Sequence, residues 1–419
     1  MAEIRNRCSK KSAYTLTLSF MSLVIVAPLI GIMIRLANQG PHHQKKTYQV
    51  TEVPLGTGVM GQIVVDNADD TIYASNNVNN TVAAVNGHSD AVRTISVGSG
   101  PYDIAIAKST DTIYVANSTY SAAPSSGTIS AISGYSGTVH TIKLAFTPGA
   151  IAVDQATDTI YATNASQTNM LYAINGHSDT ISAIRLGKPM ISINIGQQIV
   201  INQATNTIYV TNPAGNAISA VDSYTDAVHT IQVGKLPGAI AVDQATDTVY
   251  VANLVSDTIS VINAITDQVQ TINEGSQATY ALAVDQTTGS VYGLSVSGEK
   301  GITGQGNKLN TVFIINGSNG ALRTIKVGRS SNLSGAIAVD QASGTVYVMN
   351  NASNSLSVIN GDTYAVHTIR LPRSPDAMAI DQTTGTVYVA SDPSGYISVI
   401  KKIHPLTLKG KIHHNKKYF

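Results

Sequence analysis

Two copies of a Gly-His-Ser sequence are the residues of this chain that come nearest to a catalytic motif. They are Gly87-His-Ser-Asp-Ala91 and Gly176-His-Ser-Asp-Thr180. A serine nucleophile in a Gly-x-Ser-x-Gly motif requires a sharp strand-to-helix turn and a final Gly, which both copies lack. A related segment reads Gly134-Tyr-Ser-Gly137, without the His. The pattern therefore predicts hairpin turns and no hydrolase nucleophile.

A recurring aspartate is the second candidate for chemistry. It follows a short apolar segment at Asp66, Asp154, Asp243, Asp285, Asp340 and Asp381. A ring of carboxylates around a central channel would suit Ca²⁺, which takes oxygen ligands. Asp also accepts backbone N–H groups at the start of a turn. Its recurrence in six of eight repeats favours the turn interpretation, because a metal site needs only a few ligands, which need not occupy the same position in most repeats.

The remaining polar candidates have simpler explanations. His140, His229 and His367 share one position of the repeat, which other repeats fill with Arg93, Gln270 and Arg323. This mixture of types predicts a solvated surface and no metal ligands. The glycine-rich segment 298–308 lacks the strand before it and the helix after it that a phosphate-binding loop requires. The single cysteine, Cys8, excludes a disulfide within the chain and a thiolate metal cluster.

The elements that must position these residues come from an internal repeat. The phrase Ile151-Ala-Val-Asp-Gln-Ala-Thr-Asp-Thr-Ile-Tyr161 occurs eight times, in full or looser form. Its tyrosines are Tyr73, Tyr114, Tyr161, Tyr209, Tyr250, Tyr292, Tyr347 and Tyr388. Each repeat reads as four short strands, rich in Val, Ile, Thr and Tyr. In one repeat we expect strands a to d at 240–243, 248–253, 258–263 and 269–273.

Turn residues support these hairpins independently. The position between strands a and b is filled only by Gly, Asn and Asp, which accept a positive φ. These residues are Asp70, Asp111, Asp158, Asn206, Asp247, Gly289, Gly344 and Gly385. The position between strands c and d is similar, with Tyr364 as the exception.

Four-stranded units of this size cannot bury both faces alone, but they can when arranged around an axis. The sequence therefore predicts an all-β fold, an eight-bladed β-propeller of four-stranded antiparallel blades. The last repeat, 378–400, lacks a fourth strand, and we expect residues 48–56 to supply it and close the ring. Seven blades plus an irregular hairpin is the alternative, with 104–144 or 199–233 as the irregular repeat.

The ends of the chain differ from the repeats. Residues 1–12 are basic, and residues 13–35 contain a long uncharged stretch that predicts one transmembrane helix. We expect an uncleaved signal anchor with a cytoplasmic N-terminus, then a linker (36–46) and an extracytoplasmic propeller (47–400). A cleaved signal peptide, which would make the propeller a secreted protein, is the alternative. The basic tail, 401–419, would contact anionic lipid or wall polymer, or only aid solubility.

The charge of the propeller excludes one class of partner. Residues 47–400 hold 13 Lys and Arg against 24 Asp and Glu, a net charge of about −11 (13 − 24). Nucleic-acid binding requires a basic face, so we expect no nucleic-acid partner.

One motif of the repeat resembles a known family. Tyr209-Val-Thr-Asn212 has variants at 114–117, 161–164, 250–253 and 347–350, each after a phrase of the type Ala-Val-Asp-Gln. Together these resemble the YVTN (Tyr-Val-Thr-Asn) family of β-propeller repeats over about residues 48–400. The resemblance implies an exported or surface propeller, and it supplies no catalytic residues.

Candidate binding residues follow from the expected loops. The b–c and d–a loops emerge on one face of a propeller, and the insertions at 120–126, 187–198 and 296–310 fall in them. We predict that this face binds a partner. Its candidate residues are Asn77, Asn117, Tyr120, Asn164, Asn212, Asn253, Glu299, Lys300 and Asn350. The asparagines equally suit strand ends.

These observations favour a non-enzymatic binding or scaffold module at the cell envelope. Its expected partners are the membrane, through residues 13–35, and an envelope protein, a glycan or wall polymer. The alternative is a metal-dependent propeller enzyme of lactonase or lyase type with a divalent metal in the central channel. No cofactor is predicted, because the three Glu residues after position 46 form no recognisable pair.

Overall fold

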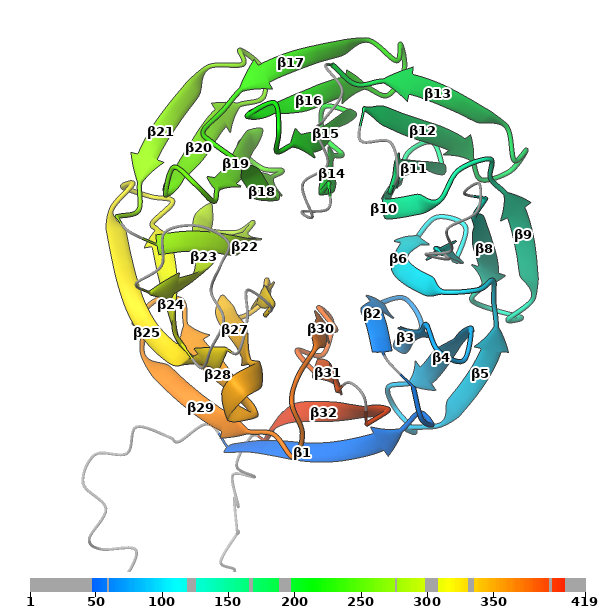
Figure 1. Ribbon diagram of the computed structural model, residues 1–419. Helices are drawn as coiled ribbons and strands as arrows, with labels where there is room; N and C mark the ends of the chain where they lie inside the picture. Colours follow the sequence, from blue (N-terminus) through cyan, green and yellow to red (C-terminus); the bar gives the residue numbers. More distant parts are fainter. Residues whose placement is uncertain are drawn as a thin grey trace, which may run out of the picture. The chain divides into compact units, whose positions relative to one another are not determined.

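The computed structural model describes residues 47–403, except 59, 119–125, 166–168, 188–196, 276, 298–307, 331–334 and 392–393. These residues form eight four-stranded sheets, which are the blades of a ring (Figure 1). The eight-bladed propeller is thus confirmed. The predicted transmembrane segment, 13–35, lies outside the described residues, and among the residues described no helix is long and apolar enough to cross a membrane.

Each blade has strands a to d from the axis outward. Blade 1 is β2 (Met60–Asp66), β3 (Thr71–Asn76), β4 (Thr81–Asn86) and β5 (Val92–Ser96). Blade 2 is β6 (Pro101–Ala107), β7 (Thr112–Asn117), β8 (Thr128–Ser133) and β9 (Val139–Lys143). Blade 3 is β10 (Pro148–Asp154), β11 (Thr159–Asn164), β12 (Met170–Asn175) and β13 (Ile181–Arg185). Blade 4 is β14 (Ile199–Asn202), β15 (Thr207–Asn212), β16 (Ala217–Asp222) and β17 (Val228–Gln232).

The second half of the ring repeats this arrangement. Blade 5 is β18 (Pro237–Asp243), β19 (Thr248–Asn253), β20 (Thr258–Asn263) and β21 (Val269–Asn273). Blade 6 is β22 (Gln277–Asp285), β23 (Ser290–Ser297), β24 (Lys308–Ile315) and β25 (Leu322–Ser330). Blade 7 is β26 (Ile337–Asp340), β27 (Thr345–Asn350), β28 (Ser355–Asn360) and β29 (Val366–Arg370), with a short 3₁₀ helix, η1 (Asn351–Ser353), after β27. Blade 8 is β30 (Ala377–Ile380), β31 (Val387–Ser391), β32 (Tyr396–Ile403) and β1 (Thr47–Pro54).

Blade 8 closes the ring as the sequence predicts. Its sheet runs in the order β1-β32-β31-β30, so the first strand of the propeller is the outer strand of the last blade. Leu55 N donates to Gly395 O at 2.8 Å just beyond the paired strands. The seven-bladed alternative was wrong, because segments 104–144 and 199–233 contribute to regular four-stranded blades, 2 and 4.

The hairpin turns adopt the backbone conformation that their residues predict. All eight a–b turn positions have a positive φ, from 47° at Asp111 to 69° at Gly385. The c–d turns do the same, from 56° at Asp226 to 71° at Gly137. Tyr364 also has φ 58°, so the exceptional residue type adopts the same turn, although a bulky side chain disfavours it.

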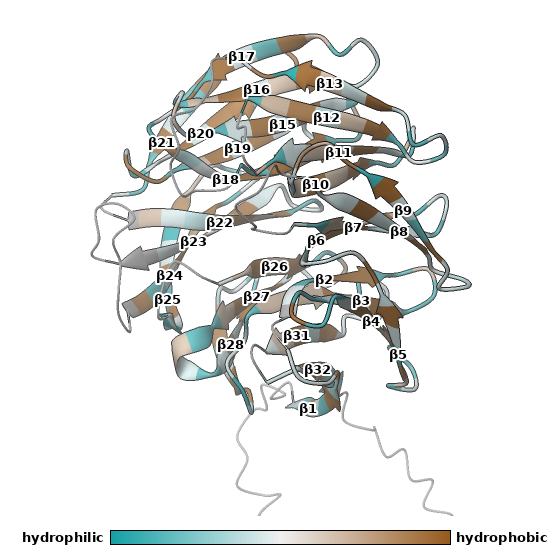
Figure 2. Ribbon diagram, turned by 45° about the vertical axis from the view of Figure 1, so that its right-hand side comes forward, coloured by the Kyte–Doolittle hydropathy of each residue, from teal (hydrophilic) through white to brown (hydrophobic). Residues whose placement is uncertain are grey.

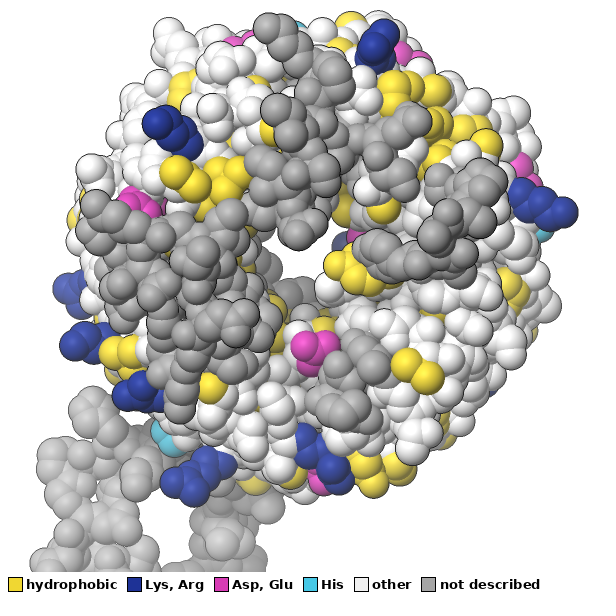
Figure 3. Space-filling model, in the orientation of Figure 1, with side chains coloured by type: hydrophobic (Ala, Val, Ile, Leu, Met, Phe, Trp, Pro, Cys, Tyr) yellow, Lys and Arg dark blue, Asp and Glu magenta, His cyan; other side chains and the backbone are white. Residues whose placement is uncertain are grey.

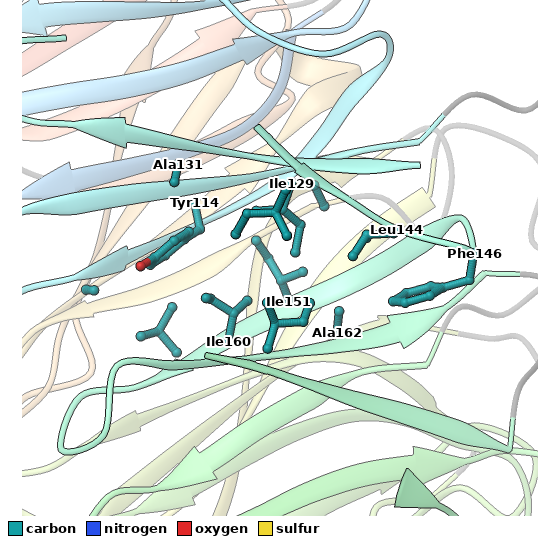
Figure 4. Close-up of a cluster of buried hydrophobic side chains, with 13 residues drawn as sticks. Tyr114, Ile129, Ala131, Leu144, Phe146, Ile151, Ile160 and Ala162 are labelled. Atoms are coloured by element: carbon teal, nitrogen blue, oxygen red, sulfur yellow. The ribbon is translucent and has the colours of Figure 1, made fainter. Parts of the chain in front are cut away.

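The hydrophobic core lies between the blades, with a buried cluster at each of the eight interfaces and a second, smaller one between blades 5 and 6. Between blades 2 and 3, Tyr114 and Ile129 pack against Ile151 and Ile160 (Figure 4). Hydrophobic residues run along the strands, and the turns are more hydrophilic (Figure 2). A blade therefore buries its faces only against its two neighbours, as a ring of repeats requires.

Candidate binding surfaces

The recurring aspartates are turn residues. Asp243 Oδ1 accepts the backbone N–H of Ala245 at 3.0 Å, and Asp381 Oδ1 accepts that of Thr383 at 2.8 Å. Asp66, Asp154, Asp285 and Asp340 make the same contact. This confirms the interpretation as turns. Within the described part of the chain, no three His, Cys, Asp or Glu residues are grouped so that they could hold a metal ion.

The glutamine that follows five of the six aspartates, and Asn202 in blade 4, has a role that was not predicted from the sequence. Gln244 Nε2 donates to Ile201 O of the preceding blade at 2.9 Å, and its Oε1 accepts the backbone N–H of Gln203 at 2.8 Å. The same two contacts are made by Gln155, Gln203, Gln286, Gln341 and Gln382. Each side chain therefore fastens two a–b turns together. The fixed Asp-Gln order was the available signal.

This ring of amides has a weak point between blades 1 and 2, where Lys108 stands in the glutamine position. In the Lys108→Gln variant, the new side-chain amide should donate to Val65 O and accept the backbone N–H of Asn67. We expect the free energy of unfolding to rise by about 1 kcal/mol, measured by urea denaturation. Gln244→Ala is the opposite change and should lower it by about 1–3 kcal/mol. Equal stability of all three proteins would contradict the role of the ring.

The asparagines predicted to bind a partner are buried within the propeller. Asn253 is 2% exposed, and its Nδ2 donates to Ser260 Oγ at 2.9 Å. Asn117, Asn164, Asn212 and Asn350 are also buried. In blade 1 the equivalent residue is Asn76, not Asn77, because Asn76 ends β3. Contact of these amides with a ligand stays a prediction, and their hydrogen bonds and burial give them a structural role.

The position of these asparagines also explains why a glycine occurs at or near the end of strand d. A Cβ added at Gly234, after β17 of blade 4, would lie 2.6 Å from Asn253 Cγ of blade 5. At Gly328 of blade 6 it would lie 2.3 Å from Asn350 Cγ of blade 7. The d–a connection of one blade therefore rests on the Asn of the next, a close approach that needs Gly.

The other predicted binding residues, Tyr120, Glu299 and Lys300, lie outside the described residues, as do most of the loop insertions that carry them. Their prediction therefore stands as it was made from the sequence.

The shared position on strand d joins neighbouring blades. His140 Nε2 lies 2.6 Å from Asp179 Oδ2, and His229 Nε2 lies 3.1 Å from Asp267 Oδ2, each in the next blade's c–d turn. The guanidinium of Arg323 lies over the ring of Tyr364, 4.7 Å from its centroid. These residues are exposed, as expected, but they are not only solvated. The contact with Arg323 gives Tyr364 a partner at its strained turn position.

The c–d turns contain the Gly-His-Ser sequences and confirm their interpretation as hairpin turns. Asn175 Oδ1 accepts the backbone N–H of His177 at 3.0 Å and of Ser178 at 2.9 Å. The same turn recurs in the c–d hairpins of blades 1 to 7, and the identity of its third residue varies. Tyr135 is 95% exposed, Tyr224 67% and Ile265 74%. The c–d turn thus presents a side chain that varies from blade to blade, on the face opposite to the predicted one.

A polar cleft of about 370 Å³ lies on this face between blades 2 and 3. The buried Asp158 carboxylate accepts the hydroxyl of Tyr114 at 3.3 Å and lies 3.1 Å from His177 Nδ1. Burial raises the pKa of Asp158, while the charge of His177 and the Tyr114 hydroxyl oppose that shift. His140 lines the same cleft. The cleft can hold a small polar group, but its buried carboxylate is already paired with Tyr114 and His177.

A further buried acid lies at another interface between blades. Glu274, between blades 5 and 6, is 9% exposed, and its carboxylate accepts the hydroxyl of Thr279. Burial raises the pKa of Glu274 to about 7, although that hydrogen bond lowers it. The native state therefore binds a proton that the unfolded chain binds only at lower pH.

Glu274→Gln should stabilise the propeller at about pH 8 by roughly 1–3 kcal/mol, since it removes a buried charge. In the parent protein, stability should rise as the pH falls through about 7 toward the ordinary range of a glutamate. The Glu274→Gln variant should not show this rise in the free energy of unfolding. Urea denaturation at a series of pH values measures it. Glu52→Gln, in a surface ion pair with Arg373, is the control and should cost less than about 1 kcal/mol. Parallel pH profiles of parent and Glu274→Gln would contradict the assignment.

Comparison with known proteins identifies the fold. No protein-family model and no curated protein matches the chain. The β-propeller domain of Myceliophteria thermophila Cps50 (Swd1) is similar to it with a TM-score of 0.54 and 7% identity, over 85% of this chain and 100% of that chain. The dihydro-heme d1 dehydrogenase NirN, in complex with DHE, is similar with a TM-score of 0.58 and 8% identity, over 75% of this chain and 66% of that chain. Identities this low show the fold alone: the chain is an eight-bladed β-propeller.

Proposed function

We propose that this chain is a membrane-anchored, extracytoplasmic propeller that acts as a non-enzymatic binding or scaffold module at the cell envelope. One observation carries the proposal: the polar residues of the repeat are used within the ring. The Asp residues accept backbone N–H groups in turns, and the Gln residues form hydrogen bonds between blades. The Asn residues are buried at strand ends, where they form hydrogen bonds within the blade. Among the described residues, side chains that vary between blades are exposed on the c–d turns, as expected of a rigid scaffold that presents a recognition surface. An envelope protein, a glycan or wall polymer is the proposed partner.

Membership of the YVTN family is part of the same proposal. Its support is the in-register repetition of the Tyr-x-x-Asn segment, as in Tyr209-Val-Thr-Asn212. The proposed anchor, residues 13–35, is supported by a long uncharged stretch after a basic N-terminus.

Protease treatment of intact cells that make the full chain tests the location. We expect the full chain in the membrane fraction and a propeller that protease can reach from outside. Recovery of the protein in the soluble cytoplasmic fraction would overturn the anchor and the extracytoplasmic location.

Elemental mass spectrometry of residues 47–403, after dialysis against metal-free buffer, tests the non-enzymatic role. We expect no stoichiometric metal. One equivalent of tightly held calcium, zinc or manganese would overturn the proposal and favour a lactonase or lyase.

A further inference from the structure

The positive charge of the propeller is concentrated on the outer strands of two neighbouring blades. Five of the thirteen Lys and Arg of residues 47–400 are Arg323, Lys326 and Arg329 on β25, Arg370 on β29, and Arg373. The first four are exposed, and neither strand contains an acid. Lys and Arg side chains gather along the rim where these two blades lie, at the lower left of Figure 3. We call these four exposed residues the basic wall.

A hollow of about 660 Å³ separates the two strands of the basic wall. Arg329 and Arg370 both line it, together with Ser353, Ser355 and Thr368, and none of the described residues that line it carries a carboxylate. Guanidinium groups bind phosphate through paired N–H donors. The hollow therefore has the chemistry of a phosphate-binding site.

The basic wall lies beside the strand through which the chain enters the propeller. The ring of Tyr48 on β1 stacks on His367 of β29, with centroids 6.1 Å apart. Glu52 of β1 is paired with Arg373, whose Nε lies 2.9 Å from Glu52 Oε1, so this acid does not oppose the wall. The proposed linker, 36–46, has eleven residues, and a chain of that length spans at most roughly 40 Å.

We propose that the basic wall docks on the anionic phospholipid head groups of the membrane that holds the anchor, with lipid phosphates between Arg329 and Arg370. Residues 47–400 carry a net charge of about −11 (13 − 24), so an anionic surface repels most of the propeller. The basic wall is the part of the propeller whose charge is complementary to that surface. Docking through the wall would place the ring edge-on to the membrane and leave both of its faces accessible to a partner. This inference rests on the proposed membrane location, but the wall can be tested without the anchor.

Vesicle binding of residues 47–403 provides the test, because this segment contains every strand that the structure describes, including the closing pair β1 and β32. We expect it to co-sediment with phosphatidylcholine vesicles that contain phosphatidylglycerol, and not with pure phosphatidylcholine vesicles. Salt should release it. Arg329→Gln combined with Arg370→Gln should lower the partition coefficient roughly thirtyfold, at about fivefold for each cation near an anionic surface.

Lys143→Gln combined with Arg185→Gln is the matched control. These exposed residues end the outer strands of blades 2 and 3 in the position of Arg370, and their loss changes the net charge equally. We expect near-parental binding from this control, with an unchanged melting temperature in both double variants.

Three results would overturn the inference: no binding to the anionic vesicles, equal binding to neutral ones, or an equal loss in the control. Failure of the membrane location appears separately, in the fractionation of the full chain, and leaves the vesicle result unaffected.

Discussion

A chain that begins at Leu55, without β1, should not form a cooperative propeller. Blade 8 would keep only β30, β31 and β32, and the edge of β32 would be exposed to other chains. Val53 is 4% exposed in the cluster between blades 8 and 1, while Tyr48 and Val50 pack against the cluster between blades 7 and 8. Their burial contributes on the order of 5 kcal/mol, comparable with the stability of a whole domain.

Thermal denaturation followed by circular dichroism, with size-exclusion chromatography, measures this effect. We expect aggregation or a broad, early transition for the chain from Leu55. A chain from Thr47 is the matched control, since it keeps the whole of β1 and should melt sharply as a monomer-sized species. If both chains melt alike, closure by β1 does not stabilise the ring.

Tyr114→Ala should be the most destabilising single substitution among those considered, at about 3–5 kcal/mol. The side chain of Tyr114 is 1% exposed and lies in the cluster between blades 2 and 3 (Figure 4). Removing it leaves a cavity that the rigid strands β8 and β11 cannot fill. It also removes the hydroxyl that donates to Asp158 Oδ1 at 3.3 Å, so a buried carboxylate loses a partner.

Two further variants separate the ring of Tyr114 from its hydroxyl. Tyr114→Phe keeps the packing and should cost about 1–3 kcal/mol, the contribution of the hydrogen bond to Asp158. Tyr135→Ala, at a 95% exposed position of the same blade, should change the free energy of unfolding by less than about 0.5 kcal/mol. Urea denaturation gives all three values. Similar costs for Tyr114→Ala and Tyr135→Ala would show that the repeated tyrosine does not hold neighbouring blades together.

The hairpins and their repetition could be read from the sequence because their causes are local. In blade 5 the predicted strands 248–253, 258–263 and 269–273 are those of the structure. A two-residue alternation and a positive-φ turn residue are properties of neighbouring residues. Only β18 differs: it begins at Pro237, before the predicted 240, because its pairing with β19 is irregular between Pro237 and Ile240.

The choice between eight and seven blades and the roles of the repeated side chains were decided by the tertiary structure. Closure joins residues more than three hundred positions apart, as in Arg373 with Glu52 and Gln382 with Asn67. Gln244, Asn253 and Tyr114 each bind or pack against another blade, so their partners lie about one repeat away in the sequence. The pattern of a strand shows which residues are apolar or turn-forming. It contains no information on which residues of the adjacent blade each side chain contacts. For the same reason, the basic wall becomes visible only in the folded ring, where residues of β25 and β29 line one hollow.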